Sequence, residues 1–218
     1  MFTETLSTNA QKSLALLGKG VLPVGTYLAG GFALALHFGH RISVDFDFFT
    51  NISFSSENLA ESLGKIGDFK AHTTLKDTLL GSFNNIKFSI FYYKYPLLFP
   101  TLDYQEIKVA DPKDIAAMKV AAVMDRGIKK DFIDLYFMSK KGIALESCFE
   151  YYEKKYKALA NNLYSIITSL SYFIDAENSE MPKMIEKVEW KEVKTFFEKE
   201  AVRLGKKYIV LVGDMKRG

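Results

Sequence analysis

Two carboxylates lie two residues apart in a segment that is otherwise typical of a buried strand. They are Asp45 and Asp47, and the residues around them include Val44, Phe46 and Phe48. Because alternate side chains of a strand point to the same face, we expect both acids on one face. Neighbouring carboxylates repel each other unless a positive charge compensates them. Mg²⁺ provides that charge and binds carboxylate, phosphate and water oxygens. The pair therefore predicts a metal site, with a solvated strand face as the plainer alternative.

A glycine pair precedes these acids. Gly30 and Gly31 directly precede an expected short helix, residues 32–38, and thirteen residues separate the pair from Asp45. Backbone N–H groups at the start of a helix bind phosphate, and glycine lets a ligand approach the backbone closely. A simple packing turn is the alternative. The glycine turn and the acids together are a more specific signal than either alone, and they predict binding of a phosphorylated ligand.

Composition excludes several classes of protein. With 48% hydrophobic and 25% charged residues the chain is an ordinary globular protein that can form a core, which excludes extended disorder. The one cysteine, Cys148, has no cysteine to pair with inside the chain, which favours a reducing cytoplasmic location. We expect no signal peptide, because the first residues lack a basic and then apolar layout. We expect no membrane span, because the uncharged residues 21–39 contain proline and four glycines. The net charge of +3 is too small to indicate nucleic-acid binding by itself.

The residue pattern predicts two domains. Residues 1–110 are expected to form a mixed α/β sheet domain with flanking helices, and residues 111–218 a helical bundle that contributes to the active cleft. Expected strands span 21–29, 43–49, 69–74, 78–83, 86–93 and 105–109, and Asn84-Asn85 predicts a tight hairpin turn. Asp111-Pro112 predicts a helix start, since aspartate caps helices and proline suits the first helical position. The expected helices of the second half span 112–125, 130–140, 145–156, 158–174 and 190–204.

The glycine turn and the acid pair resemble a known family. Residues 27–34, YLAGGFAL, and 39–49, GHRISVDFDFF, look like the AbiEii/AbiGii-type nucleotidyltransferase toxins, within the DNA polymerase beta-like nucleotidyltransferase superfamily. Residues 118–120, 125–127 and 130–136 are similar to that family's downstream helical motifs. The likeness therefore covers most of the chain.

The resemblance implies an enzyme that moves a nucleoside monophosphate from an NTP to a hydroxyl. The acceptor would be an RNA end, such as that of a tRNA, or a protein. Mg²⁺ or Mn²⁺ would be the cofactor. The chain would be the toxin of a toxin–antitoxin or abortive-infection pair, with a cognate antitoxin protein as partner and no membrane association.

The resemblance also implies roles for individual residues. Asp45 and Asp47 would hold the metal, and Gly30 and Gly31 would contact the outer phosphates. Phosphate or ribose oxygens would bind Arg41 and Ser43, while Lys119 would add a cation for the triphosphate and Asp131 would activate or orient the acceptor hydroxyl. A solvent-facing lysine and a first-turn acid favoured by the helix dipole are the alternatives for these last two.

One departure from the superfamily pattern leaves the activity open. Many members carry a third carboxylate on a later strand, and here Ser89 occupies the expected position. This departure favours one alternative, a non-catalytic module that binds nucleotide or RNA. A second alternative is a phosphotransferase, since a related fold can send the γ-phosphate rather than the nucleotide to the acceptor.

Overall fold

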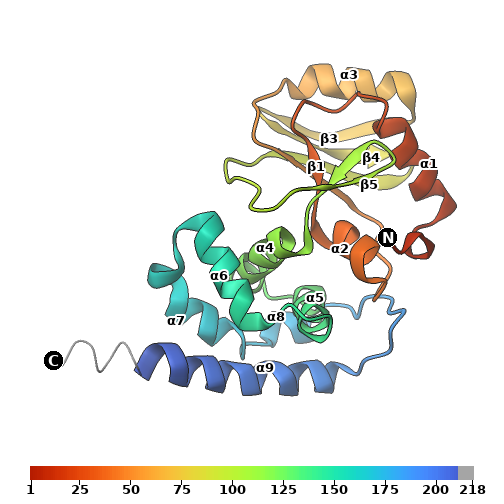
Figure 1. The fold of residues 1–218 in the computed structure, drawn as a ribbon. Helices are drawn as coiled ribbons and strands as arrows, with labels where there is room; N and C mark the ends of the chain where they lie inside the picture. The colour runs from red at the N-terminus through yellow and green to blue at the C-terminus, as the bar shows by residue number, and fades with distance from the viewer. Residues whose placement is uncertain (211–218) are drawn as a thin grey trace. The chain divides into compact units, whose positions relative to one another are not determined.

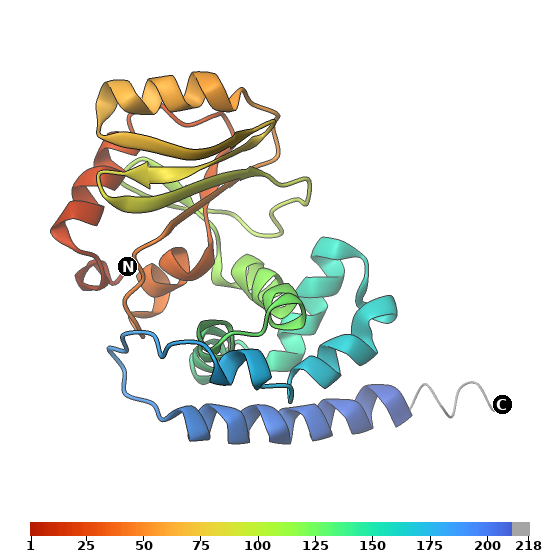
Figure 2. The same cartoon turned by 180° about the vertical axis from the view of Figure 1, so that it is seen from behind.

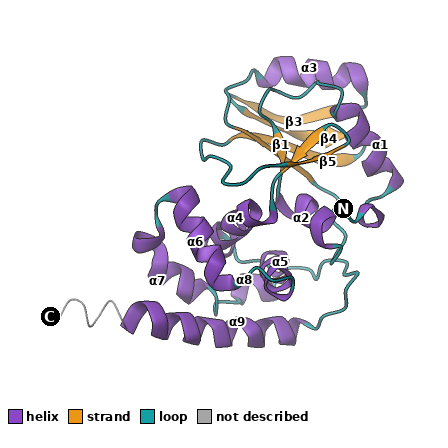
Figure 3. Cartoon of the chain, in the orientation of Figure 1, coloured by secondary structure: helices purple, strands orange, loops and turns teal. Residues whose placement is uncertain are grey.

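The computed structural model describes residues 1–210, and the chain divides into two compact units. The first is Met1–Ile115 and the second begins at Ala116, so the division falls within one helix. All strands of the described residues belong to the first unit, and the second is helical (Figure 3). The predicted fold class is therefore confirmed. Separate folding of residues 1–110 and 111–218 as domains stays a prediction.

The first unit contains one sheet and four helical segments (Figure 1). Its strands are β1 (Tyr27–Leu28), β2 (Phe46–Thr50), β3 (Phe69–Leu75), β4 (Thr78–Phe83), β5 (Ile86–Tyr92), β6 (Leu102–Tyr104) and β7 (Ile107–Val109). Its helices are η1 (Thr3–Thr5), α1 (Thr8–Leu17), α2 (Gly30–Phe38) and α3 (Ser56–Ile66), and the helix α4 (Pro112–Asp125) begins at its end.

The sheet is mixed, with the strand order β3-β4-β5-β2-β1-β7-β6. Strand β2 pairs parallel with β5 and antiparallel with β1, so it lies in the middle of the sheet. Phe46 and Phe48 of β2 are fully buried, and Phe46 packs edge-on against Phe32 of α2, with ring centroids 5.0 Å apart. Helix α3 lies over β3 and β4 (Figure 1). The apolar residues of β2 thus face a helix-covered core.

Two tight turns in the sheet contain residues with positive φ, and the sequence predicted one of the two. Asn84 and Asn85 connect β4 to β5 with φ of +51° and +63°, which confirms the predicted hairpin. Gln105 and Glu106 also adopt positive φ, +50° and +62°, and connect β6 to β7. The strand predicted over 105–109 is confirmed only for Ile107–Val109, because Gln105 and Glu106 form a turn. Such turns favour Asn or Gly, and neither residue type is present here.

Two further strand predictions were too long. The segment predicted as a strand over 21–29 contains only β1, Tyr27–Leu28. The strand predicted over 43–49 begins at Phe46 and continues to Thr50. Asp45 therefore lies just before the strand.

The second unit is a set of packed helices (Figure 2). They are the remainder of α4, then α5 (Lys129–Lys140), α6 (Leu145–Tyr156), α7 (Leu159–Ser169), α8 (Ile174–Glu177), α9 (Trp190–Gly205) and η2 (Lys206–Val210). The helix predicted over 158–174 is two helices, because the chain turns at residues 170–172 between α7 and α8. The other predicted helices are confirmed to within about two residues, the usual uncertainty of helix ends.

Aromatic side chains form much of the core of the second unit. The ring of Phe132 in α5 lies 5.2 Å from Phe173, 5.9 Å from Trp190 and 5.0 Å from Phe197 of α9. Such edge-on and tilted ring pairs stabilise a core beyond the area they bury. Helix α9 thereby packs on α5.

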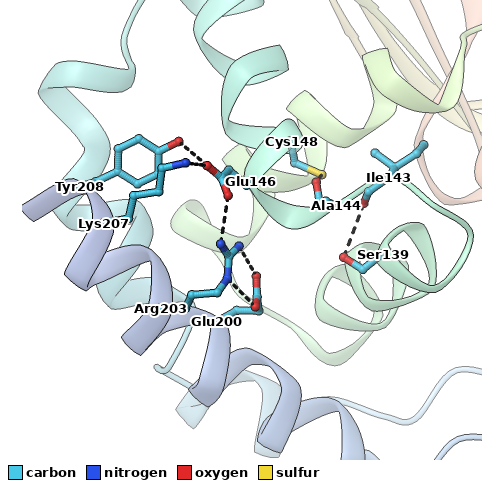
Figure 4. A network of polar contacts seen from close by, with 9 residues as sticks. All are labelled: Ser139, Ile143, Ala144, Glu146, Cys148, Glu200, Arg203, Lys207 and Tyr208. Carbon is cyan, nitrogen blue, oxygen red and sulfur yellow. Dashed lines mark hydrogen bonds and ion pairs between the residues drawn. The ribbon is translucent and has the colours of Figure 1, made fainter.

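A surface network joins the start of α6 to the end of α9 (Figure 4). Glu146 accepts hydrogen bonds from Arg203 at 3.0 Å, from Lys207 and from the hydroxyl of Tyr208. Arg203 also donates to Glu200 at 2.9 and 2.8 Å. Since one carboxylate receives two cations, the pKa of Glu146 is lowered by these hydrogen bonds, with Lys207 first. The network fixes the C-terminal turn of α9 against α6.

The predicted cap at Asp111 is confirmed. Its side chain accepts a hydrogen bond from the backbone N–H of Lys113 at 2.8 Å, and Pro112 is the first residue of α4. Asp114 is fully buried and accepts backbone hydrogen bonds from Leu98 and Phe99 at 2.9 to 3.0 Å. It therefore anchors the loop between β5 and β6. No helix among residues 1–210 has both the length and the apolar character needed to cross a membrane.

Candidate active site

The pairing of β1 with β2 brings the glycine turn to Asp47. Tyr27 lies opposite Phe49 and Leu28 opposite Phe48 in this antiparallel register. One residue further, the N–H of Ala29 donates to the backbone carbonyl of Asp47 at 2.9 Å. Gly30 therefore lies beside Asp47 although many residues separate them in the sequence.

Gly30 can occupy this position only as glycine. Its φ is +66°, which residues with a Cβ rarely adopt. A Cβ at Gly30 would lie 2.7 Å from Oδ2 of Asp47, inside van der Waals contact. The Asp47 carboxylate therefore packs directly on the backbone where α2 begins.

Gly31 adjoins the other two predicted ligand-binding residues of this unit. A Cβ at Gly31 would collide with the guanidinium of Arg41 and lie 3.3 Å from Oγ of Ser43. Arg41 is buried, with 3% of its surface exposed, and its Nη1 donates to the carbonyl of Ile42 at 3.2 Å. Arg41 and Ser43 thus lie at the first turn of α2, where backbone N–H groups also point.

The two acids have different surroundings. Asp47 is half-buried, and its Oδ1 accepts a hydrogen bond of 2.8 Å from Ser89, which lies directly opposite it in the parallel register of β2 and β5. Asp45 is also half-buried, and within residues 1–210 its carboxylate forms no hydrogen bond or ion pair with the protein. Asp45 therefore has oxygen atoms available for a ligand, and Asp47 has one fixed in direction by Ser89.

The position of Ser89 agrees with the departure seen in the sequence. It stands on the strand next to Asp47, where a third carboxylate would face the pair. Ser89 is buried, with 4% exposed, and its Oγ also lies 3.3 Å from the carbonyl oxygen of Phe46. A hydroxyl here orients Asp47 without adding a third negative charge.

The donor set fits a hard divalent cation that completes its coordination with phosphate and water. Carboxylate and hydroxyl oxygens are the ligands that Mg²⁺ prefers, and Mg²⁺ sites commonly use only one or two carboxylates. Within the described residues no group of three or more His, Cys, Asp or Glu side chains converges. These two acids therefore suit a cation that is also coordinated by a triphosphate better than a cation enclosed by protein ligands alone.

The predicted residues of the helical unit form a buried ionic cluster. Nζ of Lys119 in α4 lies 2.9 Å from Oδ1 of Asp131 and 2.6 Å from Oδ2 of Asp134, both in α5. Arg126 donates to both oxygens of Asp131, at 2.8 and 3.0 Å. The side chains of Asp131 and Asp134 are fully buried, whereas half of the Arg126 side chain is exposed. Arg126 is therefore the most exposed of these four residues.

The electrostatics of the cluster favour a charged Asp131. Burial by itself would raise the pKa of Asp131, but the charge of Lys119 and the hydrogen bonds of Arg126 outweigh it and lower that pKa. A carboxylate with a lowered pKa and both oxygens bonded to cations is a weak proton acceptor. The geometry favours Asp131 as a group that orients Lys119 and Arg126.

Sequence reasoning missed part of this cluster. Lys119 and Arg126 are seven residues apart in the sequence, a spacing that indicates one helix face. It did not indicate that Asp131 would bind both, nor that Asp134, three residues later on the same face of α5, would complete the pairing of Lys119.

Comparison with known proteins decides the family. Residues 17–109 and 93–206 match the family described as nucleotidyl transferase AbiEii toxin, Type IV TA system. The chain belongs to the AbiEii nucleotidyltransferase toxin family. A relative, protein aq_aa25 of Aquifex aeolicus (strain VF5), is 40% identical over 180 residues, which cover 79% of this chain and 84% of that protein.

Solved structures share the AbiEii fold. MenT4, the nucleotidyltransferase toxin Rv2826c from Mycobacterium tuberculosis H37Rv, superposes with a TM-score of 0.61 at 17% identity and covers 89% of this chain and 80% of its own. JHP933 from Helicobacter pylori gives a TM-score of 0.56 at 18% identity, covering 97% of this chain and 98% of its own. At these identities the likeness concerns the fold.

As a member of the AbiEii family, the chain is a nucleotidyltransferase. The non-catalytic module considered from Ser89 is therefore set aside. The matched range 17–109 contains the glycine turn and both acids of the first unit, and 93–206 contains the ionic cluster of the second.

Proposed function

We propose that this AbiEii-family enzyme transfers a nucleoside monophosphate from an NTP to a hydroxyl at an RNA end, as the toxin of a toxin–antitoxin pair. One observation carries the proposal. The glycine turn that opens α2 is hydrogen-bonded to the strand of the acid pair, with Asp47 packed on Gly30. This contact supports a phosphate-binding backbone beside a carboxylate that binds a cation.

The residues of the first unit would bind and orient the triphosphate. Backbone N–H groups after Gly30 and Gly31 point to the outer phosphates, and the guanidinium of Arg41 donates to phosphate or ribose oxygens through its planar fork. Ser43 adds a hydroxyl donor at the same turn. These groups hold the α-phosphorus in line with the incoming hydroxyl.

Asp45 and Asp47 would hold Mg²⁺ or Mn²⁺. The cation held by these residues would supply positive charge to balance the charge that develops at the α-phosphorus. Ser89 keeps the Asp47 carboxylate in one orientation. The reaction forms a bond from the acceptor oxygen to the α-phosphorus, breaks the bond to the β-phosphate oxygen, and releases the hydroxyl proton.

Lys119 and Arg126 would supply positive charge for the triphosphate from the helical unit. Asp131 would fix both cations as a positioning residue, in place of the role of activating or orienting the acceptor hydroxyl. The guanidinium of Arg126 is half-exposed, which supports Arg126 as the cation of the cluster that a ligand would contact.

The test is incubation of the purified protein with α-labelled NTPs, Mg²⁺ and total RNA. We expect label in RNA for the wild type and loss of label for Asp45→Asn and for Asp47→Asn. Asp103→Asn is the matched control, because Asp103 is an exposed acid paired with Lys108. Mass spectrometry of the product distinguishes an added nucleotide from an added phosphate. Transfer of a phosphate, or label that persists in both variants, would contradict the proposal.

A further inference from the structure

The face of the sheet that carries Asp47 continues into a row of aromatic side chains. Asp47 and Ser89 share this face, since their side chains are hydrogen-bonded across β2 and β5. Two residues further along each strand are Phe49 and Phe91, paired in the same register, with ring centroids 5.9 Å apart. The acid end and the aromatic end therefore belong to one continuous surface of the first unit.

Two tyrosines extend the row. Tyr27 of β1 lies opposite Phe49, and their rings stack with centroids 6.0 Å apart and an interplanar angle of 27°. Beyond the end of β5, the N–H of Tyr93 still donates to the carbonyl of Thr50 at 2.7 Å, and its ring lies 5.2 Å from that of Phe49. We call Tyr27, Phe49, Phe91 and Tyr93 the aromatic shelf.

The shelf differs from the apolar core on the other face of the same strands. Phe48, Phe88 and Ile90 are fully buried, whereas Phe49, Phe91 and Tyr93 are each half-buried. Rings that keep part of their surface exposed beside an acid pair are available to contact a ligand.

A second observation concerns a buried hydroxyl group of the aromatic shelf. Tyr27 is 3% exposed, and among residues 1–210 its hydroxyl has no hydrogen-bond partner. Buried hydroxyl groups in native proteins nearly always have a partner, and an exception calls for one that the protein alone does not provide. A ligand with polar edges, or a water that accompanies it, satisfies this requirement.

We propose that the aromatic shelf stacks a nucleobase whose phosphate lies at the acid pair. This inference rests on the proposed function and names the feature of the substrate that the first unit recognises. Two residues along β2 span about 7 Å, so the shelf begins one ribose away from a phosphate held near Asp47. Base stacking on aromatic rings accepts any base, which suits a platform without base-specific donors. The base belongs either to the NTP or to the terminal nucleotide of the acceptor RNA.

The experiment measures equilibrium binding of each NTP and of a short single-stranded RNA to the full chain, with Tyr93→Ala, Tyr93→Phe and Tyr92→Ala. Tyr92 is the matched control, because it is exposed and points to the opposite face of β5. We expect roughly 10-fold weaker binding for Tyr93→Ala and near wild-type binding for Tyr93→Phe and Tyr92→Ala. Circular dichroism and melting temperature verify that each variant is folded.

Inorganic tripolyphosphate separates stacking from general damage, because it has no base. Its affinity should be equal in wild type and Tyr93→Ala. A loss confined to NTP assigns the shelf to the incoming nucleotide, and a loss confined to RNA assigns it to the acceptor. If Tyr93→Ala binds NTP and RNA as tightly as the wild type, the proposed base stacking is wrong. It is also wrong if tripolyphosphate binding weakens by the same factor. Binding is measured separately from nucleotide transfer. A protein that binds these ligands but transfers no nucleotide would contradict the proposed function without contradicting base stacking on the aromatic shelf.

Discussion

Replacement of Gly30 by alanine tests the contact on which the site is built. The substitution adds one methyl group at a residue with a φ of +66°, 2.7 Å from Oδ2 of Asp47. Ordinary contact begins near 3.4 Å, so the carboxylate must retreat by about 0.7 Å. We expect both a loss of stability and a displaced acid.

The two effects have separate magnitudes. An alanine in the left-handed region costs about 1–2 kcal/mol. For a chain of this length that corresponds to a decrease in melting temperature of roughly 2–8 °C. A displacement of the reacting groups by about 1 Å costs on the order of 100-fold in rate, so we expect Gly30→Ala to lose roughly 10- to 100-fold in nucleotidyl transfer.

Gly20→Ala separates these effects. Gly20 has a φ of +85°, and a Cβ there would meet nothing within 4 Å. Its alanine variant should show the same decrease in melting temperature with no loss of transfer rate. The assay compares initial rates of α-labelled nucleotide incorporation at a temperature well below both melting transitions. Equal rates for Gly30→Ala and wild type would refute the idea that Asp47 must rest on Gly30.

Three further predictions follow from buried polar contacts. Ser89→Ala removes the donor to Asp47 and should cost about 1 kcal/mol in urea denaturation, with a slower transfer rate because the carboxylate loses its fixed orientation; unchanged values of both would refute this. Lys119→Met removes the cation between two buried carboxylates and should lower the free energy of unfolding by about 3–5 kcal/mol. The control Lys65→Met removes only an exposed ion pair within a helix and should lower it by under about 1 kcal/mol. Equal losses of stability in the two variants would contradict the buried cluster. Because the pKa of Asp131 is lowered in the folded chain, its charge stabilises the fold at neutral pH, and that stability is lost as the pH falls below about 4, the unfolded value. The difference in unfolding free energy between wild type and Asp131→Asn should therefore shrink between pH 7 and pH 3, and a constant difference would be the opposing result.

Local sequence signals predicted the parts of the fold that depend on local chemistry. The Asp111 cap and the Asn84-Asn85 turn are set by residues within a few positions of each other, and both were predicted. The turn at Gln105-Glu106 was missed, because neither residue is a usual carrier of positive φ. Tertiary pairing of β6 with β7 imposes that turn.

The candidate site also combines features that the sequence reveals with features that depend on tertiary structure. The glycine pair and Asp-x-Asp were visible in the sequence, as was the serine in place of a third acid. The antiparallel register that packs Asp47 on Gly30 is long-range and depends on strand pairing, which a single sequence does not reveal. The binding of Lys119 by both Asp131 and Asp134 depends in the same way on how α4 packs against α5.

The most direct test of the acid pair is NTP affinity with and without Mg²⁺, for wild type and for Asp47→Asn. If Asp45 and Asp47 hold a cation that a triphosphate shares, chelation of Mg²⁺ should weaken NTP binding to the wild type at least about tenfold, a difference of about 1.4 kcal/mol. Asp47→Asn should bind NTP with the same low affinity in both conditions. Equal wild-type affinity with and without Mg²⁺, or a full Mg²⁺ effect in Asp47→Asn, would contradict this assignment.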